Sequence, residues 1–257
     1  DTDDNKVVEF LDRVAKEKIE PFIDKSYQDL AEYVNAYEQK MQMKREVIAN
    51  KGIWVAKKRY ILNAHDVEGV RYKEPKLKIM GVEAVKSSTP AACREKIKDA
   101  LKIIMTKDNQ ELNSFIQDFR KDFMDLKPEL IAYPRSVNGL NKWTESHNLF
   151  KKGAPIHCKG AILYNHLLQD KKLQNKYPYI QEGDKIKFLH MKTPNVYQST
   201  SISFMTKLPN ELNLHNFIDY DMQFEKSFVE PLKFITDIIR WQIDSSYGTQ
   251  GTLEGFF

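Results

Sequence analysis

Three consecutive cations, Lys57, Lys58 and Arg59, interrupt an otherwise apolar and aromatic segment of the chain. Four more cations follow within the next two dozen residues: Arg71, Lys73, Lys76 and Lys78. From Lys57 to Lys78 seven Lys and Arg residues face three Asp and Glu, and this surplus equals the whole chain's formal net charge of +4. A local positive field of this kind suits contacts with the phosphate backbone of a nucleic-acid duplex. The alternative is a solvated, lysine-rich hairpin without a ligand.

The element expected to position these cations is a strand. Apolar and aromatic residues alternate from Gly52 to Asn63, which predicts one half-buried strand over that range. Alternation would place Lys58 on the same face as Trp54, Tyr60 and Leu62, and would place Lys57 and Arg59 with Val55 and Ile61. A turn is expected over His65–Gly69.

Helices are expected on both sides of this segment. Apolar residues at steps of three and four predict an amphipathic helix from Lys6 to Tyr37, kinked or divided at Pro21. Ser87-Ser88-Thr89-Pro90 predicts a helix start, with Thr89 as the N-cap and Pro90 as the first helical residue. That helix runs to about Thr106, and Asp108 with Glu111 predicts a capping box for the next one.

Two shorter strands are also predicted. One covers Met43–Ile48, and the other follows a turn within Glu182–Leu189. Pro128 is expected to end the second of the two central helices.

Composition and cysteine usage limit the class of protein. A chain of 257 residues can form one large domain or two, and its composition is typical of neither disordered nor membrane-spanning proteins. Cys93 and Cys158 are far apart and lack partners at metal-ligand spacing, which argues against a disulfide scaffold or a zinc site. Cys93 is expected to be a small core residue. Without a signal peptide or a long apolar run, an intracellular, reducing compartment is expected.

Three segments together resemble a known family. Lys57-Lys58-Arg59-Tyr60, then Glu74–Gly81, then Ser87-Ser88-Thr89-Pro90 occur in the order and approximate spacing of the palm-to-thumb passage of family B DNA polymerases. The chain is most similar to the T-even-type phage replicative enzymes. The resemblance covers nearly the whole chain and is weaker over 131–152 and 193–214.

The resemblance implies a fold and a domain organisation. The expected fold class is α+β, with a partial palm of antiparallel strands and a packing helix, followed by a mostly helical thumb with a small β element. Residues 1–86 would be the C-terminal part of the palm, 87–250 the thumb, and 251–257 a C-terminal clamp-binding tail. Pro90 onward would form two antiparallel thumb helices whose apolar stripes are core rather than base-stacking surfaces.

The resemblance also implies a function and its contact residues. The chain would hold primer–template DNA and position the primer terminus within a DNA-directed DNA polymerase, whose remaining N-terminal part lies in the same polypeptide or in a partner chain. The DNA-binding residues carried over from the family are Lys57, Lys58, Arg59, Tyr60, Lys76, Lys78, Ser87, Ser88 and Thr89. A duplex-binding module without catalytic activity is the alternative.

Catalytic carboxylates are the least specific part of the resemblance. Asp1-Thr2-Asp3 matches a palm motif that binds the Mg²⁺ ions of the assembled polymerase, but the strand that follows it in the family is missing here. A frayed or helix-capping acidic terminus is the competing interpretation. Glu46 matches a family glutamate near the metal pair, although Lys44 stands where that family has an acid. A metal-dependent nuclease or transferase built on Asp1 and Asp3 is a further alternative.

The end of the sequence is apolar. Leu253, Phe256 and Phe257 follow a glycine-containing stretch and resemble the peptide by which the phage enzymes bind a sliding clamp. A structural tail docked on the chain itself is the alternative. The partners expected from the resemblance are therefore primer–template DNA, the N-terminal part of the polymerase and a sliding clamp, with no membrane, in the cytoplasm of a phage-infected bacterium.

Overall fold

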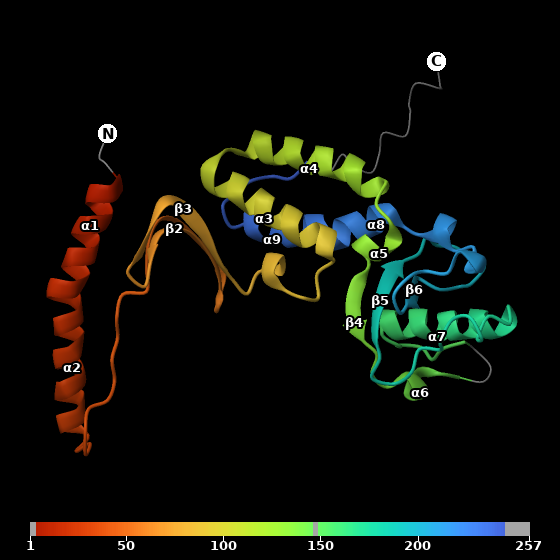
Figure 1. Ribbon diagram of the computed structural model, residues 1–257, viewed down its shortest axis with the longest axis horizontal. Coiled ribbons are helices and arrows are strands. Elements are labelled where there is room, and N and C mark those ends of the chain that lie inside the picture. Colours follow the sequence, from red (N-terminus) through yellow and green to blue (C-terminus); the bar gives the residue numbers. More distant parts are fainter. Residues whose placement is uncertain (1–3, 146–148, 245–257) are drawn as a thin grey trace. The chain divides into compact units, whose positions relative to one another are not determined.

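The computed structural model describes residues 4–145 and 149–244. These residues form two compact units, which divide between Met80 and Gly81 (Figure 1). Asp1, Asp3 and the apolar residues Leu253, Phe256 and Phe257 lie outside the described residues. Within the described ranges, no helix combines the length and apolar character needed to cross a membrane.

The first unit begins with one long helical rod (Figure 1). Helices α1 (Asp4–Val14) and α2 (Glu20–Tyr33) are joined by a π-helical turn, Ala15–Ile19. Pro21 lies in the first turn of α2, where its missing N–H costs little. The helix is therefore divided slightly before Pro21 rather than at it, since the π-turn ends at Ile19, and it ends at Tyr33 rather than at the predicted Tyr37.

Three antiparallel strands complete the first unit in the order β1-β2-β3. Their bounds are β1 Val47–Ala56, β2 Arg59–Val67 and β3 Val70–Met80. The central strand is buried on both faces, with Ile61 and Ala64 fully covered. Strand β3 is an edge strand, which explains why it tolerates Pro75 and several lysines.

The prediction of a single strand from Gly52 to Asn63 is wrong. The chain reverses at Lys57–Lys58, and Ala56 pairs with Arg59 across the resulting hairpin. Lys58 adopts a left-handed backbone conformation with φ of 61°, as such a tight turn requires. Apolar residues alternate with other residues on both strands of the hairpin. An alternation with a period of two residues therefore cannot distinguish one long strand from two strands joined by a two-residue turn. The predicted faces of Lys57 and Lys58 are wrong for the same reason.

Other strand limits also differ from the sequence predictions. The second turn contains only Glu68 and Gly69, both with positive φ, while His65, Asp66 and Val67 belong to β2. Strand β1 begins at Val47, so the predicted strand Met43–Ile48 is confirmed only at its last two residues.

The second unit opens with an antiparallel helix pair. Helices α3 (Ala91–Thr106) and α4 (Asn109–Met124) are joined by Lys107 and Asp108, and the Asp108 carboxylate accepts a hydrogen bond from the Glu111 N–H at 2.9 Å. The prediction that Thr89 is the N-cap of the first helix is wrong. Pro90 is extended with ψ of 141° and occupies that position, because the chain bends into the helix one residue later than expected.

A second antiparallel sheet follows the helix pair in the order β4-β5-β6. The strands are β4 Tyr133–Ser136, β5 Lys185–His190 and β6 Ser201–Phe204, and β5 with the preceding turn at Gly183 confirms the prediction for Glu182–Leu189. Helix α7 (Ile156–Asp170) packs directly on β6, since a Cβ added at Gly160 would lie 2.6 Å from the Ser203 nitrogen.

Short helical elements occur throughout the second unit, the first of them before α3. They are Glu83–Val85, α5 Pro128–Ile131, α6 Leu140–Trp143, Asn210–Leu212, His215–Phe217, α8 Tyr220–Phe224, a π-turn Glu225–Val229 and α9 Glu230–Thr236. Helix α4 ends at Met124, and Pro128 begins α5 after a brief connection.

The core of the second unit is aromatic. Phe119 and Phe123 of α4 contact Phe224 and Phe228 with ring centroids 4.7 to 5.8 Å apart. Cys93 is fully buried, with its sulfur 3.2 Å from the Ser227 hydroxyl. The apolar stripes of α3 and α4 are therefore core, as predicted, and both cysteines are free thiols. The two units together confirm the predicted α+β class.

Candidate nucleic-acid interface

The β1–β2 turn presents two adjacent cations. Lys57 and Lys58 form the tip of the hairpin and are exposed, and neither amine has an ion pair within the described part of the chain. Arg59 follows as the first residue of β2 and is half-buried. The hairpin therefore keeps two uncompensated positive charges in solvent, which is the arrangement that phosphate contacts require.

An aromatic row crosses the sheet immediately beside this turn. Trp54 is the register partner of Tyr60, and Tyr60 is the register partner of Met80. Directly opposed residues of antiparallel strands point to the same face. Trp54 is 67% exposed and Tyr60 is half-buried, so aromatic surface adjoins the cations of the turn.

A glycine makes room for the Trp54 ring. A Cβ added at Gly52 would lie 2.7 Å from Cζ3 and Cη2 of Trp54 and 2.8 Å from Cδ2 of Leu62. The distal edge of the indole thus lies against Gly52, where any side chain would collide with it. Trp54 was not predicted as a site residue, because its position directly across from Tyr60 becomes evident only once the hairpin register is known.

The two lysines of β3 have partners. The Lys76 amine lies 4.5 Å from the centroid of the Tyr72 ring. Lys78 forms an ion pair with Glu46, and the hydrogen bond to this carboxylate raises the pKa of the Lys78 amine. Lys78 therefore stays charged, but much of its field is neutralised locally. The structure brings together a predicted DNA contact and a predicted metal-proximal residue.

The remaining predicted contacts belong to the second unit. Ser87 is exposed, and the Ser88 carbonyl accepts a hydrogen bond from Nη1 of Arg135 at 3.3 Å. Thr89 is only 5% exposed, so its side chain offers almost no surface to a ligand. The predicted DNA-binding residues accordingly form two groups, one on each unit.

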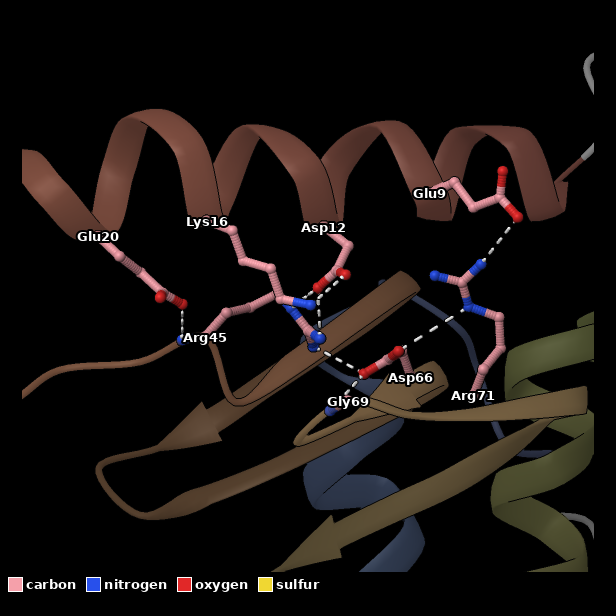
Figure 2. Close-up of polar contacts among 8 residues, drawn as sticks. All are labelled: Glu9, Asp12, Lys16, Glu20, Arg45, Asp66, Gly69 and Arg71. Carbon is pink, nitrogen blue, oxygen red and sulfur yellow. Dashed lines mark hydrogen bonds and ion pairs between the residues drawn. The ribbon is translucent and has the colours of Figure 1, made fainter.

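An ionic network fixes the sheet to the helix in the first unit (Figure 2). Arg45, in the segment that precedes β1, lies between the two elements. Its Nη2 is 2.7 Å from Oδ1 of Asp12 on α1, and its Nη1 is 2.8 Å from Oδ1 of Asp66 on β2. Its backbone N–H also donates to Glu20 of α2 at 3.1 Å. A single residue thereby ties three elements together.

The same network reaches the second hairpin turn. Oδ1 of Asp66 accepts a hydrogen bond from the Gly69 N–H at 2.9 Å, while Oδ2 lies 3.8 Å from Nε of Arg71 (Figure 2). Arg71 also approaches Glu9 at 3.5 Å. These contacts hold β2 and β3 beneath α1, which keeps the sheet that carries the cationic turn in a fixed shape.

The charges of this network shift the proton affinities of its members. Burial opposes the charge of Arg45, but hydrogen bonds to Asp12 and Asp66 outweigh it and raise the pKa of the guanidinium. The hydrogen bond from Lys16, aided by Arg45, lowers the pKa of Asp12. Sequence reasoning missed this network because Arg45 lies 33 residues from Asp12 and 21 from Asp66, and no local spacing identifies such pairs.

The carboxylates of the described residues do not form a metal site. No group of three or more His, Cys, Asp or Glu side chains in the described ranges is arranged to hold a metal ion. Glu46 lines an open cavity of about 660 Å³ together with three cations, Lys16, Lys44 and Arg45, and two further carboxylates, Glu20 and Glu68. Asp1 and Asp3 fall outside the described residues.

Comparison with known proteins finds similarity to two phage DNA polymerases. It is 33% identical over 240 residues to the DNA-directed DNA polymerase of Enterobacteria phage T4, a match that covers 89% of this chain and 26% of that protein. It is 36% identical over 247 residues to the DNA-directed DNA polymerase of Escherichia phage RB69, covering 91% of this chain and 27% of that protein. No family model matches the chain. The chain spans about a quarter of the length of the curated relatives that it matches.

Proposed function

We propose that this chain, a relative of one portion of the phage T4 and RB69 DNA-directed DNA polymerases, is the C-terminal palm-and-thumb part of a family B DNA polymerase. The observation that supports this most strongly is the identity of 33% and 36% over about nine-tenths of the chain. The whole polymerase performs template-directed DNA synthesis, and this part holds the primer–template duplex and positions the primer terminus.

The hairpin turn is the physical basis for the duplex contact. Lys57 and Lys58 project uncompensated charge, and each phosphate that they neutralise releases counterions, which favours binding at low salt. Tyr60 and Trp54 supply aromatic surface beside the charges, which can pack on sugars or bases without selecting a sequence. This combination predicts affinity for duplex DNA that depends on salt rather than on base sequence.

The two units correspond, in this proposal, to two functional parts. The first unit, with its sheet and cationic turn, acts as the remaining palm, and the second unit, with the α3–α4 pair, acts as the thumb. Ser87 and Ser88 lie near the start of the second unit, a few residues after its first residue, Gly81. In this proposal they contribute further contacts with the DNA.

Magnesium binding belongs to the assembled polymerase in this proposal. Bound Mg²⁺ ions activate the primer hydroxyl and stabilise the leaving phosphate. The described residues do not fit such a site, since the Glu46 carboxylate is paired with Lys78 and no carboxylate cluster surrounds it. We therefore assign the metal ions chiefly to the rest of the polymerase, with Asp1 and Asp3 as further candidates on this chain.

The apolar end of the chain completes the proposal. Leu253, Phe256 and Phe257 provide a short apolar anchor that binds a sliding clamp and keeps the polymerase on DNA. The assembled enzyme works in the cytoplasm of an infected bacterial cell.

Fluorescence anisotropy with a labelled primer–template tests the duplex contact. The purified chain is expected to bind duplexes of different sequence with similar affinity, and a plot of log affinity against log salt is expected to be linear with a negative slope. A primer-extension assay with the remaining polymerase polypeptide, expressed separately, then tests the assignment to an enzyme. Binding without any extension in the mixture would favour a non-catalytic DNA-binding module, and the absence of duplex binding would contradict the proposal.

A further inference from the structure

We propose that one side of the α1–α2 rod is the surface on which the rest of the polymerase polypeptide docks. This inference rests on the proposed function and specifies the contact between its two parts. We call the surface the outer apolar stripe, and it consists of Phe10, Ile19, Phe22, Leu30 and Tyr33.

The rod has three sectors along its length. The first faces the sheet and contains Val8 and Leu11, which line a pocket with Ile48 and His65, together with Asp12, which binds Arg45. The second is polar and contains Glu9, Arg13, Glu17, Asp24 and Gln28. The third is the outer apolar stripe, whose members recur at helical spacing once the extra residue of the π-turn is included.

The stripe is exposed throughout its length. Phe10 is 55% exposed, Ile19 50%, Phe22 72% and Tyr33 88%. From Phe10 to Tyr33 the stripe extends roughly 35 Å, given the rise of an α-helix per residue. Isolated exposed apolar side chains are common, but a row of large exposed apolar side chains along one side of a helix marks an interaction site.

A wide apolar surface on one helix indicates that the helix lies between two layers. An amphipathic helix that covers a single sheet needs only one apolar sector, and the sector with Val8 and Leu11 already serves that purpose here. The stripe adjoins that sector and is separate from the polar sector of Glu17 and Gln28. The sequence therefore specifies a second packing partner for the rod.

The length of the relatives identifies the partner. The matched phage polymerases are about four times as long as the matched segment, since the matches cover only 26% and 27% of them. In a polymerase of that length, the polypeptide outside the matched segment provides a partner that can cover the stripe. A mainly apolar surface with Phe and Tyr side chains suits a permanent interface of this kind, which resembles a domain core.

The experiment uses the complete chain and the remaining polypeptide of the same polymerase, expressed separately. The double variant Phe22→Ser, Tyr33→Ser is expected to raise the Kd of the complex at least tenfold in isothermal titration calorimetry. The matched control Glu17→Ser, Gln28→Ser, on the polar sector, is expected to change the Kd less than twofold. Far-UV circular dichroism checks that each variant folds, and the single variant Tyr33→Ser repeats the test with a smaller change.

Hydrogen exchange provides a second measurement. Amides of α2 are expected to become more protected when the remaining polypeptide is added to the wild-type chain. Several outcomes would overturn the inference: no complex with the wild-type chain, an unchanged Kd for the double variant, or a homodimer of the chain that the double variant disrupts.

The same variants separate this inference from the proposed function. Duplex binding by the chain alone depends on the hairpin turn and should be the same for the double variant and the wild type. If duplex binding persists while docking is insensitive to the stripe, the docking inference fails and the proposed function stands. If the wild-type chain does not bind duplex DNA, the proposed function fails.

Discussion

Glu46 and Lys78, which lie 32 residues apart in the chain, form an ion pair across the first unit. Each was expected from the sequence to serve a different ligand, the glutamate a metal ion and the lysine a phosphate. Because the two side chains are paired, Glu46 is not fully available to a metal ion and Lys78 is not fully available to a phosphate. The cationic turn at Lys57 and Lys58 has no such compensation within the described residues, so it dominates the local positive field.

Replacing Glu46 with Gln should strengthen duplex binding. The change removes the charge that holds Lys78, so the Lys78 amine can contact a phosphate and the surface gains one unit of positive charge. We expect a few-fold lower Kd and a salt dependence steeper by about 0.9 units of slope, which is the value for one added contact. Anisotropy titrations over a range of salt concentrations measure both, with Glu95→Gln in the second unit as the control. A Kd that rises or stays constant would show that Lys78 does not contact DNA.

Two substitutions at Lys58 should separate the effect of charge from that of backbone conformation. Lys58 has φ of 61°, a conformation that Asn tolerates better than Ala. Lys58→Asn is therefore expected to weaken duplex binding and reduce the salt slope by about 0.9, with little change in stability. Lys58→Ala should weaken binding similarly but should be less stable than Lys58→Asn, because Asn adopts this backbone conformation at lower cost than either Lys or Ala.

The control for Lys58 is Lys25→Ala, which removes the same charge from the exposed surface of α2. Anisotropy titrations measure the effect of the lost charge on duplex binding, and thermal unfolding measures the effect of backbone conformation on stability. If Lys25→Ala reduces the salt slope as much as Lys58→Asn does, overall net charge rather than the turn determines binding.

Removing Asp66 should destabilise the first unit strongly. The Asp66 side chain is 3% exposed and is paired with Arg45. Asp66→Ala therefore leaves the Arg45 guanidinium, which has little access to water, with Asp12 as its remaining carboxylate partner. We expect a loss of about 3–5 kcal/mol in the free energy of unfolding of this unit. Glu9→Gln, at the exposed end of the same network, should cost less than about 1 kcal/mol.

Urea unfolding followed by Trp54 fluorescence measures the Asp66 effect, with Trp143 and Trp241 replaced by Phe. Trp54 then reports on the first unit alone, because the other two tryptophans belong to the second. A loss below about 1 kcal/mol for Asp66→Ala would mean that the helix and the sheet do not depend on this pair.

The Cys93 thiol should be inert in the folded protein and should make stability depend on pH. Burial raises the pKa of Cys93 from 9.0 to about 12, although the hydrogen bond with Ser227 opposes this shift. Above pH 9 the thiol ionises in the unfolded state before it does so in the folded state. Its contribution to stability is therefore complete below pH 9 and declines as the pH rises toward 12.

Thiol titration with a disulfide reagent tests this in a Cys158→Ala background. The native protein should react slowly, and the urea-unfolded protein should react at once. The free energy of unfolding should fall more steeply with pH above about 9 than in the variant that also carries Cys93→Ala. Rapid reaction of the native protein would contradict the burial of this thiol.

Some features of this protein follow from short stretches of sequence. The amphipathic spacing predicted α1, α2, α3 and α4, and Asp108 with Glu111 located the start of α4. The surplus of lysine and arginine between Lys57 and Lys78 identified the cationic segment from residue types alone. These properties depend on residues that are close together in the chain, so the order of residues is sufficient to define them.

Other features depend on which distant residues meet. The alternation of apolar residues continues on both sides of Lys57–Lys58. Only the antiparallel pairing of β1 with β2 showed that these lysines form a turn rather than part of a strand. The pairing of Glu46 with Lys78 and the bridging of Asp12 and Asp66 by Arg45 likewise require the complete fold. Sequence periodicity indicates which residues share a face of one element, but it does not identify the residues that they contact. Those contacts are set by the pairing of strands and by the packing of helix on sheet.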